Sequence, residues 1–127
     1  MKKVLIIGGV AGGASTAARL RRHSEEDRII MFEKGPHVSF SNCGLPYHLS
    51  GMISEVEKLV LMSPQKFLAQ YNIEARVNSE VIEIDRKNKE VVVKMVLLKK
   101  HIERAMINLY FQWELSLLFQ NLKGLTV

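Results

Sequence analysis

The only cysteine of the chain, Cys43, lies in the segment SFSNCGLPY. A single thiol forms no internal disulfide, so this residue is either a reactive group or a packing residue. Ser41 or Asn42 is expected to cap a short helix with Cys43 in its first turn, where free backbone N–H groups stabilise a thiolate. The alternative is a buried cysteine that packs like a small apolar residue. Gly44 and Pro46 leave room for a flat ligand beside the sulfur, which favours the reactive thiol.

A glycine-rich turn near the amino terminus predicts a phosphate-binding loop. It follows the apolar run 3–7, opens a helical pattern, and consists of Gly8, Gly9, Val10, Ala11, Gly12 and Gly13. A backbone without Cβ atoms lets a pyrophosphate approach closely, and a helix N-terminus favours its negative charge. The strict G-x-G-x-x-G pattern is broken by Val10. A tight strand–helix turn without a ligand is therefore the alternative.

An acidic residue at the expected distance supports the ligand-binding interpretation. Glu33 lies twenty positions after Gly13, where a dinucleotide site needs a carboxylate to accept the ribose hydroxyls. Such an acid fits an unphosphorylated adenosine ribose, which NAD and FAD share. These residues alone do not separate the two cofactors, and Glu33 as a solvated strand end is the alternative.

The elements that must position these residues form a strand–helix–strand unit. A strand is expected over 3–7, a helix over 11–22 and a second strand over 28–33. The remaining expected elements are a short helix over 42–49, a helix over 64–71 capped by Ser63, and hairpin strands over 77–84 and 90–94. The predicted fold is α/β, a partial Rossmann-like domain that carries a cysteine loop.

Composition excludes several classes of function. The 127 residues suit one modest domain, and the net charge of +5 fits phosphate-rich ligands. No lysine–arginine run or stacking motif indicates nucleic acid, and no apolar run is long enough for a membrane span. The four histidines lack metal-ligand spacing, so no metal site is expected. A short apolar run ended by glycines is unlike a signal peptide, and with one cysteine it indicates the reducing cytoplasm.

The segments VLIIGGVAGG, FEKG and SFSNCGLPY together resemble the N-terminus of the flavin-dependent pyridine nucleotide-disulfide oxidoreductases. The resemblance covers Lys2 to about Lys94 and is most specific in CGLPY, because two-cysteine members carry a C-x4-C pair instead. It points to the single-cysteine branch, coenzyme A-disulfide reductases and persulfide reductases. NADH oxidases and peroxidases are close relatives of that branch.

This resemblance implies cofactors, a substrate and roles for particular residues. It implies FAD, NAD(P)H as co-substrate, a homodimer, and a Cys43 that alternates between thiolate and a mixed disulfide with coenzyme A. The cofactor-binding residues that it implies are Gly8, Gly9, Val10, Ala11, Gly12, Gly13, Glu33, Lys34 and Val81. The substrate-binding residues that it implies are Arg22, Ser39 and Asn42. A solvated helix end is the alternative for Arg22, and a core strand position is the alternative for Val81.

Residues 1–94 are expected to be the N-terminal part of an FAD/NAD(P)-binding domain, and 95–127 a tail without family likeness. Read one base earlier, the codons of Met106 and Ile107 require aspartate, and those of Trp113 and Glu114 require glycine. The codons between them permit YDKLIFSMG, which resembles the family's next strand, YDKLILATG. We therefore hypothesise that the tail is an out-of-frame translation. The rival is a genuine short protein whose amphipathic tail docks a partner.

Two functional hypotheses follow. The first is a truncated FAD- and NAD(P)H-dependent oxidoreductase that reduces coenzyme A disulfide or a persulfide. A fragment of an NADH oxidase or peroxidase is the alternative within this enzymatic hypothesis. The second, non-enzymatic hypothesis is an inactive fragment with at most weak dinucleotide binding. Because the later strands of the sheet are expected to be missing, the strand–helix–strand unit should also expose an edge.

Overall fold

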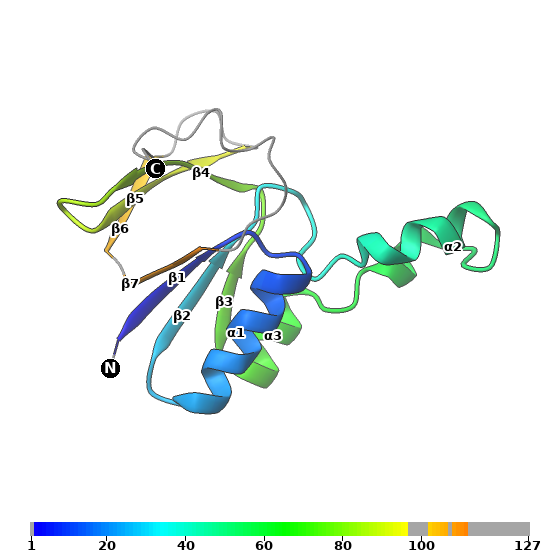
Figure 1. The fold of residues 1–127 in the computed structure, drawn as a ribbon, viewed down its shortest axis with the longest axis horizontal. Helices are drawn as coiled ribbons and strands as arrows, with labels where there is room; N and C mark the ends of the chain where they lie inside the picture. Colours follow the sequence, from blue (N-terminus) through cyan, green and yellow to red (C-terminus); the bar gives the residue numbers. More distant parts are fainter. Residues whose placement is uncertain (1, 97–101, 107, 112–127) are drawn as a thin grey trace.

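The computed structural model describes residues 2–96, 102–106 and 108–111, and it has three layers (Figure 1). The middle layer is a four-stranded parallel sheet in the order β3-β2-β1-β7. Helices α1 and α3 cover one face of this sheet, and a three-stranded antiparallel sheet, β4-β5-β6, covers the other (Figure 1). The bounds are β1 Lys3–Ile7, α1 Ala11–His23, β2 Arg28–Phe32, α3 Pro64–Tyr71, β3 Ile73–Arg76, β4 Ser79–Asp85, β5 Glu90–Met95, β6 Ile102–Met106 and β7 Asn108–Phe111.

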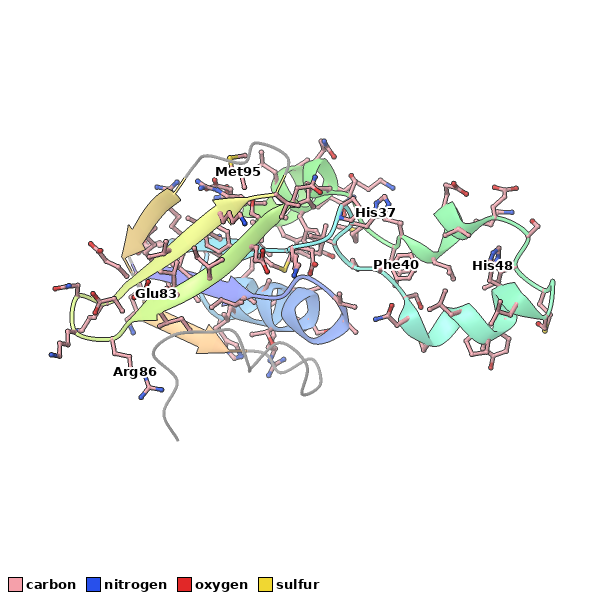
Figure 2. The ribbon with its side chains drawn as sticks, turned by 90° about the horizontal axis from the view of Figure 1, so that it is seen from above. His37, Phe40, His48, Glu83, Arg86 and Met95 are labelled. Carbon is pink, nitrogen blue, oxygen red and sulfur yellow. The ribbon has the colours of Figure 1, made fainter. Side chains whose placement is uncertain are left out.

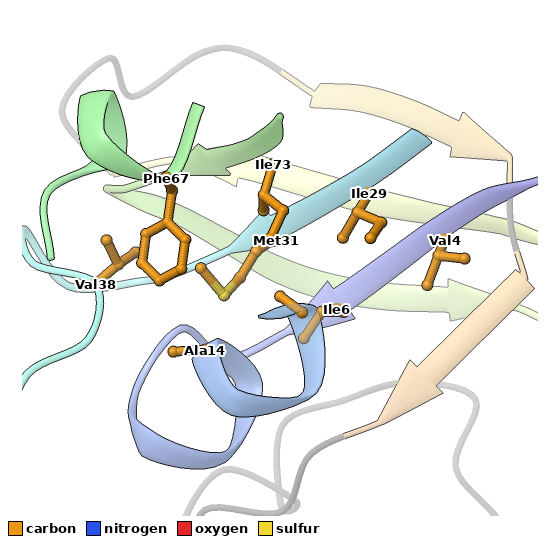
Figure 3. Packing of buried hydrophobic residues seen from close by; sticks show 9 residues of the cluster. Val4, Ile6, Ala14, Ile29, Met31, Val38, Phe67 and Ile73 are labelled. Carbon is orange, nitrogen blue, oxygen red and sulfur yellow. The ribbon is translucent and has the colours of Figure 1, made fainter. Parts of the chain in front are cut away.

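The continuous apolar runs of β1 and β2 are explained by burial on both faces of the parallel sheet. Val4, Ile6 and Met31 face the helices and form one cluster with Ala14 of α1 and Phe67 of α3 (Figure 3). The alternate residues face the antiparallel sheet, in a second cluster made of Leu5, Ile30, Phe32, Val81, Ile84, Val91 and Val93. A strand buried on both sides loses the apolar–polar alternation of a surface strand, so its sequence reads as one apolar run.

The strand register brings the two predicted cofactor features to one edge of the sheet. Strands β1 and β2 are parallel and pair from Lys3↔Arg28 to Ile7↔Phe32. Both strands therefore end side by side, and Gly8 and Glu33 follow them directly. The predicted strand–helix–strand unit and the α/β fold class are confirmed.

The predicted hairpin is confirmed, because β4 and β5 pair antiparallel from Ser79↔Met95 to Asp85↔Glu90, but the expected exposed edge and the start of the first hairpin strand are wrong. Strand β7 pairs in parallel with β1, from Val4↔Asn108 to Ile7↔Phe111, so β1 is not an exposed edge. The expected strand over 77–84 begins only at Ser79, and β3, Ile73–Arg76, lies before it in the other sheet. Asn78, with a φ of 51°, turns the chain between these two strands. Strand β3 was missed because it has only four residues at a sheet edge, and Glu74 and Arg76 in it suggest no core strand.

The predicted helix over 64–71 is confirmed, with its cap. The Ser63 hydroxyl accepts a hydrogen bond from the Lys66 backbone N–H at 3.2 Å, and Pro64 occupies the first turn. The helix ends at Asn72, whose φ of 50° is the left-handed conformation typical of a helix C-terminus.

The segment between Phe40 and Val60, which form an isolated β-bridge, projects from the body as an arm (Figure 1). It contains the 3-10 helix η1 (Asn42–Gly44), helix α2 (Leu45–Leu49) and the 3-10 helix η2 (Val56–Leu59). Figure 2 shows Phe40 where the arm leaves the body and His48 farther out. Helix α2 has no buried residue. The single short helix expected over 42–49 is thus two elements, of which only the second is α-helical.

Candidate functional site

The glycine loop, residues 8–13, is held tightly against the end of β2. Gly8 has a φ of 96°, which only glycine adopts readily, and its N–H donates to the Phe32 carbonyl at 2.8 Å. A Cβ added at Gly9 would lie 2.9 Å from Cγ1 of Val38 and 3.0 Å from Cβ of Glu33. The turn therefore requires glycine at both positions, for conformation at the first and for space at the second.

The carboxylate of Glu33 joins this loop to the chain beyond β2. Its Oε2 accepts the Gly9 N–H and its Oε1 accepts the Gly35 N–H, each at 2.7 Å. A carboxylate offers about four lone-pair directions, so two remain for further donors such as ribose hydroxyls. The spacing of Glu33 from the loop suggested a ligand contact but not these two backbone contacts, which only the folded chain reveals.

The first turn of α1 suits an anion. Val10 is the N-cap residue and makes no side-chain capping bond, and the first turn contains no acidic residue. Its backbone N–H groups lack partners within the helix and carry the positive end of the helix dipole. Gly13 and Ala14 are buried, which lets the helix lie close to the sheet. These features fit the pyrophosphate of a dinucleotide.

Backbone hydrogen bonds fasten the cysteine loop, residues 39–44, to the glycine loop. The Ser39 N–H donates to the Gly9 carbonyl at 2.6 Å, and the Ser39 carbonyl accepts the Leu61 N–H at 3.1 Å. Ser39 is buried and has a φ of 54°, unusual for a residue other than glycine. Two segments that are thirty residues apart in the chain are thus fixed side by side at one edge of the parallel sheet.

Cys43 is exposed, which excludes the alternative of a buried packing cysteine. It lies in the 3-10 helix η1, and its Sγ is 3.2 Å from the hydroxyl of Ser41. Ser41 is the N-cap residue of η1 but makes no side-chain capping bond, so the expectation that it caps this helix is wrong. The expected capping by Asn42 is wrong too, because Asn42 is itself the first residue of η1. The Ser41 hydroxyl contacts the sulfur instead of a backbone N–H.

Three predicted positions remain: Arg22, Lys34 and Val81. Arg22 is exposed in the last turn of α1, at the opposite end of this helix from the glycine loop. Lys34 forms an ion pair with Glu80 at 2.8 Å. Val81 is buried in β4, and the Ser79 N–H of the same strand donates to the Glu33 carbonyl at 2.9 Å. Strand β4 therefore begins beside the Glu33 backbone.

The buried arginine of α1 is Arg21, which sequence reasoning did not single out. Its guanidinium donates to the carbonyls of Ser24, Glu25, Asp27 and Asn72, at 2.5 to 3.1 Å. It therefore ties the end of α1 to the loop before β2 and to the end of α3. No sequence pattern separates Arg21 from its neighbour Arg22.

A cleft of about 370 Å³ lies apart from these loops, lined among others by Phe32, Arg76, Val93 and Met95. The Arg76 guanidinium lies over the Phe32 ring, 5.7 Å from its centre. Burial alone would raise the pKa of Glu74 in this cleft, but hydrogen bonds from Arg76 and Arg28 outweigh it and hold that pKa below its ordinary value. No residue of the glycine loop or the cysteine loop lines the cleft. We interpret the ion pairs of Glu74 with Arg28 and Arg76 as structural contacts and not as a ligand site.

Within the part of the chain that the structure describes, no group of three or more His, Cys, Asp or Glu side chains could hold a metal ion. Among the same residues, no helix has both the length and the apolar character needed to cross a membrane.

The fold and the two loops define a Rossmann-like α/β domain. Its cysteine loop carries an exposed thiol and is hydrogen-bonded to the glycine loop. The sequence profile of the pyridine nucleotide-disulphide oxidoreductases matches residues 2–106, and the chain belongs to that family. The match extends beyond residue 94, where the tail was expected to begin. The predicted resemblance to this family is confirmed.

Similar proteins narrow the comparison within the family. The chain is 39% identical over 93 residues to coenzyme A disulfide reductase of Staphylococcus epidermidis, which covers 73% of this chain and 21% of that protein. The structure of reduced Bacillus anthracis CoADR-RHD matches with a TM-score of 0.81 and 44% identity, over 86% of this chain and 20% of that one. An NAD-dependent persulfide reductase from A. fulgidus matches with a TM-score of 0.80 and 29% identity, over 87% and 21%. The chain thus spans about a fifth of the length of these relatives.

Proposed function

We propose that this chain is the N-terminal part of an FAD- and NAD(P)H-dependent reductase of coenzyme A disulfide or a persulfide, with Cys43 as its redox thiol. The observation that carries the proposal is the exposed Cys43 on a loop that is hydrogen-bonded to the glycine loop through Ser39 and Gly9, at 2.6 Å. Sequence identities of 37–44% to proteins named coenzyme A disulfide reductase or CoADR support the substrate class.

The described residues fit the ADP half of FAD. The glycine loop and the first turn of α1 would hold the pyrophosphate, and Glu33 has lone pairs left for the ribose hydroxyls. Lys34 and the backbone at Val81 would lie along the adenine side, since β4 begins beside Glu33. FAD, when bound, supplies the passage of two electrons from NAD(P)H to a disulfide.

The chemistry of Cys43 is thiol–disulfide exchange. Its thiolate attacks one sulfur of the disulfide, so that a bond forms between Cys43 and one half while the other half leaves as a thiolate. Two electrons then cleave the mixed disulfide and restore the Cys43 thiolate, and the second half leaves. One NAD(P)H and one proton thereby convert one disulfide into two thiols. Asn42, Ser39 and Arg22 would bind the substrate, Asn42 and Ser39 beside the sulfur and Arg22 near its phosphates.

The activity also needs the parts of the longer relatives that this chain does not match. We infer that an NAD(P)H-binding portion and a dimerisation portion belong to the complete enzyme, which would work in the reducing cytoplasm. Alone, residues 1–127 are proposed to retain thiol exchange and dinucleotide binding but not turnover. The alternative, a fragment of an NADH oxidase or peroxidase, has weaker support. The water-forming NADH oxidase from Lactobacillus brevis is only 20% identical to this chain, and at that identity the likeness extends to the fold alone.

The tail hypothesis is a separate proposal. Residues 95–127 are proposed to be read out of frame. Strand β7, which pairs with β1, would then occupy the position of the strand that the correct reading frame encodes. Resequencing the locus tests this proposal. A verified gene with no family-like reading frame across these codons would contradict it.

The function is tested with the purified chain and oxidised coenzyme A. Incubation with coenzyme A disulfide is expected to add the mass of one coenzyme A at Cys43, and a reductant should remove it. The Cys43→Ser variant is the matched control and should gain no mass. Equal or faster reaction with glutathione disulfide, which lacks the nucleotide, would contradict specificity for coenzyme A. No adduct in a folded protein would contradict the redox role of Cys43.

Cofactor binding is tested separately by titrating FAD and following the loss of flavin fluorescence. We expect saturable binding to the unmodified chain and weaker binding to Glu33→Ala. A folded chain that binds no FAD at about 100 μM, a level well above the affinities expected for a resident cofactor, would contradict the cofactor proposal.

A further inference from the structure

The hydroxyl of Ser41 lies 3.2 Å from the sulfur of Cys43, two residues along the chain. Neither the glycine loop nor the expected substrate contacts give Ser41 a role. The distance is short for a hydroxyl–sulfur pair, and either atom could donate while the sulfur is a thiol. A thiolate has no proton, so once Cys43 is ionised the hydroxyl must be the donor.

Backbone contacts hold Ser41 in place on both sides. Its N–H donates to the Leu59 carbonyl at 2.8 Å, and its carbonyl accepts the Gly44 N–H at 3.0 Å. A Cβ at Gly44 would lie 2.5 Å from Cδ2 of Leu59, so the turn and η2 are packed against each other at this point. The serine is therefore presented to the sulfur by a closed turn, and its hydroxyl needs only to rotate to donate.

The Ser41 hydroxyl is available to donate a hydrogen bond to the sulfur, because it makes no capping bond to η1. Among the described residues, no titratable side chain on the surrounding elements forms a hydrogen bond or ion pair with the sulfur. On η2 and the residue before it these groups are Glu55, Glu57 and Lys58, and Glu55 pairs with Lys58 at 3.3 Å. The others are Tyr47 and His48 of α2, of which His48 contacts the Ile53 carbonyl through its Nδ1, and His37, which stacks on Phe40. Among the described residues, Ser41 is the polar side chain in hydrogen-bond contact with the sulfur.

We propose that Ser41 is a positioning residue that donates a hydrogen bond to the Cys43 thiolate, a role that rests on the proposed function. The bond would stabilise negative charge on Sγ and would hold Sγ in one orientation for attack. It would also ease the second half of the cycle. There, the two electrons that NAD(P)H supplies cleave the bond between Cys43 and the substrate sulfur, and the negative charge that returns to Sγ meets the donor already in place. No proton moves from Ser41 in either half.

The test compares Ser41→Ala and Ser41→Thr with the unmodified chain, using iodoacetamide to alkylate the thiol between pH 6 and pH 10.5. A background variant, Cys43→Ser, corrects for alkylation of other groups. At pH 7 we expect the alanine variant to react about three- to tenfold more slowly, the low range for a hydrogen bond to a charged group because the pair is exposed. The threonine variant keeps a hydroxyl and should stay within about twofold of the unmodified chain. An ordinary cysteine thiol is almost fully ionised at about pH 10.5, and there the alanine variant should react as fast as the unmodified chain or faster, because a thiolate without the hydrogen bond is the stronger nucleophile.

The pH dependence separates this role from a structural one. A displaced loop would change the alkylation rate by the same factor at every pH, and that result would overturn the proposal, as would equal rates for alanine and serine throughout. Circular dichroism spectra of the variants check that the fold is retained. Alkylation needs neither cofactor nor disulfide substrate. A missing coenzyme A adduct would therefore contradict the proposed function, whereas the alkylation rates judge Ser41 alone.

Discussion

Glu33 is predicted to stabilise the fold before any ligand binds. Replacing it with alanine removes two charge-assisted hydrogen bonds, to the Gly9 and Gly35 N–H groups, each 2.7 Å long. Hydrogen bonds to charged groups contribute about 1.5–3 kcal/mol each in the interior. The carboxylate is only half-buried, so water can partly replace it. We therefore expect Glu33→Ala to lower the free energy of unfolding by about 2–3 kcal/mol.

Urea denaturation without cofactor, followed by far-ultraviolet circular dichroism, measures this loss. Glu83→Ala is the matched control, because Glu83 is exposed in β4 (Figure 2) and its side chain has no hydrogen bond or ion pair with another described residue. Its effect should stay within about 0.5 kcal/mol. Glu33→Gln keeps one acceptor oxygen but points an amide N–H₂ at the second backbone donor, so its stability should fall near that of the alanine variant. If Glu33→Ala and Glu83→Ala unfold at the same urea concentration, the carboxylate does not hold the loop.

Three further predictions concern the free energy of unfolding of this chain. Gly9→Ala has no room for its Cβ and should cost about 1–3 kcal/mol in the same assay; a variant as stable as the unmodified chain would contradict the packing described. Arg21→Met removes four bonds to carbonyls and should cost about 2–4 kcal/mol, whereas Arg22→Met should be nearly neutral; equal effects would count against the distinction. The backbone N–H of Asn88 holds the pKa of Asp85 below its ordinary 3.8. Its stabilisation is therefore present above pH 3.8 and is lost as pH falls through the lower folded value. The free energy of unfolding, measured between pH 5 and pH 2, should fall less steeply for Asp85→Asn than for the unmodified chain. An identical fall in the two proteins would refute the assignment.

Local patterns in the sequence were sufficient for most of the secondary structure. The apolar runs of β1 and β2, the glycine turn between β1 and α1, and the Ser63–Pro64 start of α3 each lie within a few consecutive residues. Their signals are intrinsic to backbone conformation and to burial on both strand faces. Glu33 could be singled out by spacing alone, because a strand and a helix of ordinary length separate it from the glycine loop.

The contacts that build the candidate site could not be read in this way. The bonds from Gly9 to Glu33 and from Ser39 to Gly9 span 24 and 30 positions, and they exist only because β1 and β2 end at one edge of the sheet. The same holds for Arg21, whose carbonyl partner Asn72 is 51 positions away. Capping preferences favoured Ser41 as a helix cap, but the tight turn aims its hydroxyl at Cys43.

The α/β class, the glycine loop, the acid that follows it and the single thiol could all be recognised in the amino-acid sequence. Each of these depends on residue type and short-range spacing. The folded chain sets which groups come into contact: the Glu33 carboxylate contacts two backbone N–H groups, the cysteine loop contacts the glycine loop, and Ser41 contacts the sulfur of Cys43. These contacts depend on the register of the strands and on the geometry of a turn. The donor–acceptor distance of a hydrogen bond varies by only a few tenths of an ångström, and no sequence pattern specifies atomic positions that finely.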